Sequence, residues 1–296
     1  MIHTTTSPMT SPSRPATTIH NPAALTRGSL FAALCLLGFA NGVAQSIAVA
    51  IQEAGLGEAV LRTFGVSVLV WVAAWLCPQW MAQSHDQPPT RMDLAVAAAA
   101  IPAFLLPVSW SSWIGLTGIA LYLLVAVRPA VGRSPSPALR RAAWVLLAAT
   151  STMFWGPLLL IVMGEFLLKG DAILVGWLPA SPRYGNTVQF AGGSGYLWIA
   201  EACSSLSGIS LVILCWTLFS QSRGLRWSPS SVGWCGLACL SVTVINVARM
   251  GLMVLYPNRY ELLHGPIGAG VVGWLTLALI VTLCSYGTRG RAPAHA

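Results

Sequence analysis

The feature that most constrains this chain is a succession of long apolar stretches that polar residues barely interrupt. Residues 29–51, 142–164, 232–256 and 267–286 each approach or exceed the length of about 20 apolar residues that an α-helix needs to cross a bilayer. Only 8% of the 296 residues are charged and 55% are hydrophobic, which leaves too little charge to cover a water-soluble protein of this size. The sequence therefore predicts an all-α polytopic membrane protein.

Further apolar runs bring the expected number of transmembrane helices to about eight. Two short runs, residues 94–110 and 113–127, form a pair joined by Ser111 and Ser112. The first apolar run also has features of a signal sequence. It is longer than a signal core of roughly 7–15 residues and more spans follow it, so we interpret it as a transmembrane helix. The remaining two runs are residues 59–77 and 206–219.

The arginines set the expected orientation. Eight spans place both termini on one side, and the positive-inside rule makes that side the cytoplasm because residues 128–141, 221–231 and 287–296 then face inward. If the short pair were a single span, the four arginines of residues 128–141 would face outward. The net charge of +8 is thus explained by inner loops, and no nucleic-acid partner is expected. The expected partner surface is the lipid bilayer.

The chain divides into four expected parts. Residues 1–28 are rich in Ser, Thr and Pro and predict a disordered cytoplasmic tail. Residues 29–164 form a five-helix membrane region with a short acidic loop at 52–58. Residues 165–286 form a second membrane region that begins with a long outer loop, residues 165–202. Residues 287–296 form a basic cytoplasmic tail.

The outer loop contains two short runs that suit β-strands, Asp171–Trp177 and Asn186–Phe190, with prolines and glycines around them. This composition predicts a small β-hairpin on the membrane surface. Such a hairpin would roof the start of the next helix and could pair with an extended peptide by strand addition. The alternative is a capping loop without a partner.

Three residues stand out as candidates for chemistry at the outer face. Cys203 follows a glycine-rich loop and precedes an apolar run, and a helix N-terminus favours the nucleophilic thiolate. Arg249 lies inside an apolar run, where an arginine costs roughly 2.5–3.5 kcal/mol at the centre of a span and usually serves a function. His264 directly precedes the last span. The expected topology brings all three to one depth and one face.

Each candidate also has a plainer interpretation. Cys203 would then be a small residue at a helix start, Arg249 an arginine that snorkels to the interface, and His264 an ordinary loop histidine.

Three polar neighbours are expected to support the site. Asn246 lies one turn before Arg249 and shares its helix face, although it could equally make an interhelical hydrogen bond. Glu201 and Ser204 flank the cysteine, and an exposed loop carboxylate is the plainer interpretation of Glu201.

The other six cysteines lie within or at the ends of apolar runs, where a cysteine usually packs as a small hydrophobic residue. The chain has no Cys-x-x-Cys pair and no cysteine–histidine ligand spacing. We therefore expect no metal site, no cofactor and no disulfide framework.

Several of these motifs together resemble the exosortase/archaeosortase family of multi-span membrane cysteine transpeptidases. The residues that carry the resemblance are EACSSLSGIS at Glu201–Ser210, NVARM at Asn246–Met250, and His264 followed by Gly265. In the outer loop, D-x-x-x-x-G at Asp171–Gly176 and V-x-F-x-G at Val188–Gly192 also fit. The resemblance covers about residues 165–286.

The resemblance implies a catalytic Cys203, Arg249 and His264 on the extracytoplasmic face of the plasma (inner) membrane. The implied substrates are exported, membrane-anchored proteins whose C-terminal sorting signal consists of a short motif, a transmembrane helix and a basic tail. Ser205 stands where the family usually has glycine, so the choice of substrate is expected to differ from that of the family. Ser205 and Gly265 are the residues expected to lie nearest the substrate.

Two alternatives lie outside this activity. The chain could be a transporter that binds an anionic solute through Arg249, or a degenerate family member kept as a scaffold. The sequence contains no visible inverted repeat and no acid–base relay across several spans, which argues against a transporter.

Overall fold

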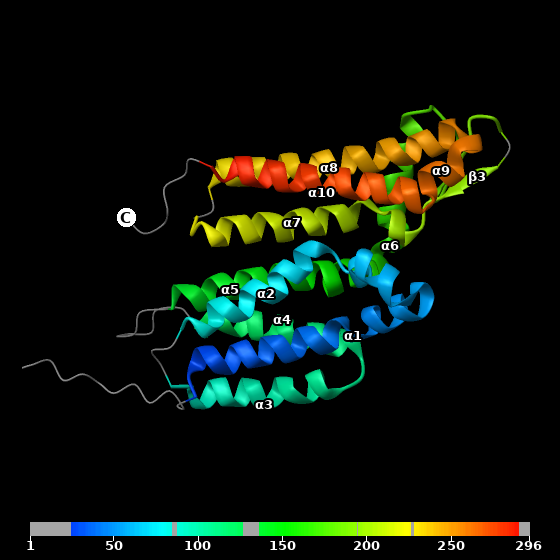
Figure 1. Cartoon of the computed structure of the whole chain (residues 1–296). Helices are drawn as coiled ribbons and strands as arrows, with labels where there is room; N and C mark the ends of the chain where they lie inside the picture. Colours follow the sequence, from blue (N-terminus) through cyan, green and yellow to red (C-terminus); the bar gives the residue numbers. More distant parts are fainter. Residues whose placement is uncertain (1–24, 85–87, 127–135, 194, 226–227, 290–296) are drawn as a thin grey trace, which may run out of the picture.

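The computed structural model describes residues 25–84, 88–126, 136–193, 195–225 and 228–289, and it consists mostly of helices with one small sheet (Figure 1). The N-terminal helices, which pack against one another, are α1 (Arg27–Leu61), α2 (Val68–Ala82), α3 (Arg91–Leu105), α4 (Ser109–Ala126) and α5 (Pro137–Thr150). Most of the expected tail at residues 1–28 and of the basic tail at 287–296 lies outside the described residues.

The described residues of the second half of the chain form five further α-helices. A π-helical turn, Ser151–Trp155, connects α5 to α6 (Gly156–Trp177). The remaining helices are α7 (Ser205–Ser222), α8 (Pro229–Leu255), the short α9 (Tyr260–His264) and α10 (Pro266–Gly287). α7 packs against α5 and α2 on one side and against α8 and α10 on the other, so it joins the two halves.

Five stretches of the described chain are long and apolar enough to cross a membrane, and α2 and α4 are shorter apolar helices. This finding supports the predicted membrane character. The five stretches are Arg27–Leu61, Pro137–Trp177, Ser205–Ser222, Pro229–Leu255 and Pro266–Gly287.

Close contact between α1 and α4 depends on two glycines one turn apart. A Cβ at Gly38 would lie 2.6 Å from Leu116 Cδ2, and a Cβ at Gly42 would lie 2.9 Å from the Trp113 ring. The Trp113 indole N–H donates to the Gly42 carbonyl at 3.2 Å. Small residues at this spacing let transmembrane helices approach closely enough for such contacts.

The start of α3 carries a buried charge network that ties three helices together. Asp93 is fully buried and accepts hydrogen bonds from Arg27 Nε on α1 at 2.9 Å and from the Tyr122 hydroxyl on α4 at 2.8 Å. It also accepts from the backbone N–H and the hydroxyl of Thr90, at 2.8 and 2.7 Å. The carboxylate is thus fully paired, as a buried charge must be.

Three antiparallel strands lie at one end of the bundle (Figure 1). They are β1 (Arg183–Tyr184), β2 (Thr187–Gln189) and β3 (Tyr196–Trp198), in the order β1-β2-β3, with Val188 opposite Leu197. β2 confirms the strand predicted at Asn186–Phe190, and the sheet has one strand more than the predicted hairpin.

The prediction of a strand at Asp171–Trp177 was wrong, because these residues belong to α6, and the outer loop therefore begins at Leu178 rather than Glu165. The helical spacing of the buried residues explains the difference. Leu160, Gly164, Leu168, Ala172 and Val175 repeat at three- and four-residue intervals and form one buried face.

Two other predicted boundaries also differ. The acidic loop expected at residues 52–58 is helical, since α1 continues to Leu61 with a break at Gly55, whose φ of +76° suits glycine. The second apolar helix consequently begins at Val68 rather than Ala59. The short pair of helices is joined by residues 106–108, and Ser111 lies within α4, where its hydroxyl donates to the Ala103 carbonyl at 2.7 Å.

Replacing Asp93 with alanine should destabilise the N-terminal bundle strongly. The change leaves Arg27 without its acceptor in a nearly buried position, and loss of one partner of a buried ion pair costs about 3–5 kcal/mol. Thermal unfolding of the full chain in detergent measures the effect. Glu165→Ala, which removes the exposed Glu165–Lys169 pair, should leave the midpoint nearly unchanged. Equal midpoints for the two variants would contradict the prediction.

Candidate active site

The predicted site residues lie at the sheet end of the bundle, where α6, α8 and α9 meet the start of α7 (Figure 1). A small hydrophobic cluster fills the space between these elements. Its buried members include Val188 and Leu197 of the sheet and Met250 and Val254 of α8. The half-buried Cys203, together with Tyr260 and Leu263 of α9, packs against the same cluster. The turn that carries Cys203 and the helix α9, which ends at His264, therefore pack against the same hydrophobic cluster.

Cys203 ends a 3₁₀ turn, Glu201–Cys203, and does not start the helix itself. Ser204 is the N-cap of α7, and its Oγ accepts from the Leu206 N–H at 3.3 Å. The Ser205 N–H donates to Asp171 Oδ2 at 3.2 Å. These first N–H groups of α7 are therefore already paired. The expected activation of the thiol by free helix N-terminal donors does not apply in this geometry.

Asp171 is a site residue that the sequence did not single out. It lies on α6 with only 6% of its surface exposed and also accepts a hydrogen bond from the Ser204 hydroxyl at 3.0 Å. One carboxylate thus holds the two residues that follow Cys203. The sequence signal was present in the D-x-x-x-x-G motif, but assigning the segment to a strand hid the direction in which Asp171 points.

Asn246 connects α8 to the cysteine. Its Nδ2 donates to the Cys203 carbonyl oxygen at 2.7 Å and contacts Ser205 Oγ at 3.2 Å. Two interpretations of Asn246 were predicted, support of the site and an interhelical hydrogen bond. The observed bonds are compatible with both, because they join α8 to Cys203 and to the start of α7. The side chain of Ser205 is buried and is engaged with α8.

Arg249 lies one turn further along α8 and connects it to α9. Its Nε and Nη2 both donate to the Leu263 carbonyl oxygen, at 3.2 and 3.1 Å. Leu263 directly precedes His264, so the arginine fixes the backbone beside the histidine. Its Nη1 makes no hydrogen bond to any described residue. The guanidinium is half-buried and bonded within the protein, which differs from an arginine that snorkels freely into water.

His264 is exposed and its ring stacks on Tyr260, with the ring centroids 5.0 Å apart and the planes 10° from parallel. Among the described residues, no hydrogen bond joins it to Cys203 or Arg249. Gly265 has a structural reason to be glycine, since a Cβ there would lie 2.4 Å from the Glu261 carbonyl oxygen. The Glu201 side chain is exposed and forms no ion pair with the described residues. No contact of this side chain therefore supports the role predicted for it.

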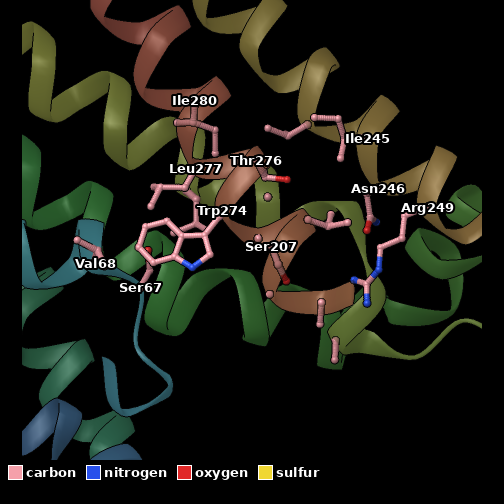
Figure 2. A pocket seen from close by; sticks show the side chains of 18 of the residues that line it. Ser67, Val68, Ser207, Ile245, Asn246, Arg249, Trp274, Thr276, Leu277 and Ile280 are labelled. Atoms are coloured by element: carbon pink, nitrogen blue, oxygen red, sulfur yellow. The ribbon is translucent and has the colours of Figure 1, made fainter. Parts of the chain in front are cut away.

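A cavity of about 530 Å³ adjoins this arrangement between α7, α8 and α10 and the segment that leads into α2 (Figure 2). Arg249, Asn246 and Ser207 lie together at one end, and Leu277 and Ile280 lie toward the other. Ser204 and Ser205 also line it, whereas Cys203 and His264 do not. Within the described part of the chain, no group of three His, Cys, Asp or Glu residues is placed to hold a metal ion.

Comparison with known proteins adds no relative: no family model, no curated protein and no solved structure matches this chain. The site is therefore interpreted from its own geometry.

Replacing Asp171 with alanine should loosen the segment around Cys203. The change leaves the Ser204 hydroxyl and the Ser205 N–H without their acceptor, at a cost of about 1–3 kcal/mol. In a variant that keeps only Cys203, alkylation by a membrane-impermeant maleimide should be faster after Asp171→Ala. Asp171→Asn retains an acceptor oxygen and should have a smaller effect.

Glu201→Ala is the matched control, because this carboxylate is closer in sequence but has no side-chain partner among the described residues. It should alkylate at the rate of the parent. A faster rate for Glu201→Ala than for Asp171→Ala would argue against the assigned role of Asp171.

Proposed function

We propose that this chain is a membrane cysteine transpeptidase or endopeptidase, similar to the exosortase/archaeosortase family, with Cys203 as nucleophile. The observation that carries the proposal is the pair of contacts from α8. Asn246 holds the carbonyl of Cys203 and Arg249 holds the carbonyl of Leu263, next to His264. These two residues are one helical turn apart, so one rigid element holds both the cysteine and the histidine segment.

We place eight spans in the membrane, with both termini in the cytoplasm and the site on the extracytoplasmic face. The start of α1 and the end of α10 lie at the end of the bundle opposite the sheet (Figure 1), which supports a common side for the termini. The inward arginines of residues 128–141 and 221–231 favour the same orientation. The sheet and α9 then lie outside, at the boundary where a membrane-anchored substrate presents its cleavage site.

The first half of the proposed reaction forms an acyl-enzyme. The Cys203 thiol gives its proton to His264, and the sulfur attacks the scissile carbonyl carbon. The carbonyl oxygen becomes an oxyanion that accepts a hydrogen bond from Arg249 Nη1. The other two guanidinium nitrogens, Nε and Nη2, bind the Leu263 carbonyl. The peptide C–N bond then breaks, and the leaving nitrogen takes the proton from His264.

The second half regenerates the enzyme. An amine, an alcohol, a lipid headgroup or water attacks the thioester carbon and passes its proton to His264. The C–S bond then breaks, and the departing Cys203 sulfur takes that proton back from His264. The substrate would lie between Cys203 and His264. Catalytic hydrogen bonds of a substrate-free enzyme often tighten only when the substrate is in place.

The sheet offers a surface for the peptide ahead of the scissile bond. β3 forms one side of the sheet, pairs with β2, and has no second strand partner among the described residues. Tyr196 and Trp198 on this strand are exposed, and Cys203 follows five residues after Trp198. Strand addition to this edge would read an extended sorting motif just outside the substrate's transmembrane helix.

Replacing Cys203 with alanine should abolish processing and leave membrane insertion intact. The test uses the source organism with the gene deleted and complemented by either form. C-terminal peptide mass spectrometry should find exported proteins that lose their apolar helix and basic tail only with the wild-type chain. Cys235→Ala, at a half-buried cysteine of α8, should process normally. A transporter or a scaffold would be indifferent to Cys203→Ala, so continued processing by that variant overturns the mechanism.

Arg249→Lys should reduce processing by about 100-fold or more, because lysine keeps the charge but cannot bind Leu263 and an oxyanion through one planar fork. The rate of tail loss in pulse-chase labelling measures the change. Arg259→Lys, at an exposed arginine of the short turn before α9, is the control and should match the wild type. Wild-type rates for Arg249→Lys would make Arg249 a structural anchor only.

A further inference from the structure

The proposed reaction uses Arg249 at the rim of the cavity and no other residue that lines it. We propose that it binds one anionic phospholipid, with the headgroup phosphate at Arg249 and one acyl chain along the walls formed by α7, α8 and α10. This binding site goes beyond the proposed function and would exist whether or not Cys203 is a nucleophile.

The lining of the cavity changes from polar to apolar along its length, as a lipid changes from headgroup to acyl chain. At the outer rim the lining is polar, with Arg249, Asn246 and Ser205. Further along the same helices it is apolar, with Leu211, Val242, Leu277 and Ile280. On α10 the lining runs from Ala269 to Ile280, which at 1.5 Å per residue is about 16 Å. That depth is about half of a 30 Å hydrocarbon core, and so about one leaflet.

The charge of the cavity selects an anionic headgroup. Arg249 and Arg62 both line it, and no Asp or Glu is among the described residues that do so. Arg62 forms an ion pair with Glu58 on α1, whereas the neutral Leu263 carbonyl is the one hydrogen-bond partner of the Arg249 side chain within the described residues. No described carboxylate therefore pairs with the Arg249 guanidinium, and its Nη1 can donate to a phosphate oxygen whenever no substrate oxyanion occupies that nitrogen.

The shape of the cavity suits an acyl chain. It has a volume of about 530 Å³ and extends along α10 for about three helical turns. An extended acyl chain is narrower than a helix with its side chains, which is about 10 Å wide. We therefore assign the cavity to an acyl chain.

A lipid in this place would also join two parts of the bundle. One wall comes from α8 and α10 and the other from Leu61 to Val68, at the junction of α1 and α2. α7 packs against α2 and α5 as well as α8 and α10. The bound chain would fill the space beside α7, and a ligand that binds only the folded state raises its stability.

The glycines of α10 provide a test that leaves the fold unchanged. A Cβ at Gly273 would meet no atom within 4 Å, and Gly273 lines the cavity. The first atom of a new side chain at Gly273 therefore enters open space, and we expect Gly273→Leu to occupy part of the cavity. Gly236 on α8 is equally open and does not line the cavity, so Gly236→Leu is the matched control.

The experiment adds dioleoylphosphatidylglycerol or dioleoylphosphatidylcholine to the full chain in detergent. Native mass spectrometry and the unfolding midpoint then report bound lipid. The wild type and Gly236→Leu should bind one phosphatidylglycerol, with a higher midpoint, and should prefer it to phosphatidylcholine by about ten-fold or more in Kd. Gly273→Leu should lose at least about ten-fold in affinity, and Arg249→Gln should lose the headgroup preference.

Equal binding by Gly273→Leu and the wild type would overturn the site, and equal affinity for the two lipids would overturn the headgroup assignment. Displacement of phosphatidylglycerol by a synthetic apolar helical peptide would assign the cavity to a helix instead. The same measurements in Cys203→Ala separate this inference from the reaction, because lipid binding should persist there even when processing is lost.

Discussion

The arrangement of the site depends on two hydrogen-bonded contacts from one helix. Asn246 and Arg249 bind backbone carbonyls of Cys203 and Leu263, which lie far apart in sequence. Backbone carbonyls are obligatory acceptors, and α8 supplies the donors for these two. The two contacts therefore hold a 3₁₀ turn and a short helix against the same turn of α8. The sheet contributes the buried Val188 and Leu197 to the hydrophobic cluster that also contains Met250 and Val254 of α8.

The network around Cys203 changes the chemical argument. A carboxylate, Asp171, lies at the start of α7 where a free helix terminus would have favoured the thiolate. In the proposed reaction, the base and the cation therefore come from other elements, as His264 and Arg249. The structure also gives the Ser205 side chain a role. Its hydroxyl accepts a hydrogen bond from Asn246, so Ser205 is part of the support of the segment that carries Cys203.

Sequence reasoning predicted the helical membrane fold, since apolar runs near bilayer length leave few alternatives. It placed β2 correctly and missed the helical course of Asp171–Trp177, because a β-branched run near glycines has no periodicity that separates strand from helix. That error also concealed Asp171. Arg249 was singled out because a charged residue stands out in apolar surroundings, Asn246 because it lies one turn before Arg249, and Cys203 because it lies between a glycine-rich loop and an apolar run. The Leu263 carbonyl could not be found, because a backbone group carries no sequence signal.

The order of the site residues along the chain has a consequence for synthesis. Asp171, Cys203, Asn246 and Leu263 emerge from the ribosome in that order, and each bond waits for the later partner. Until Leu263 has emerged, Arg249 is a cation without its acceptor, and α8 has only part of its outer contacts. Cys203 is therefore made before Arg249 and Leu263, and the contacts that place α9 beside α8 form only when the last part of the chain docks.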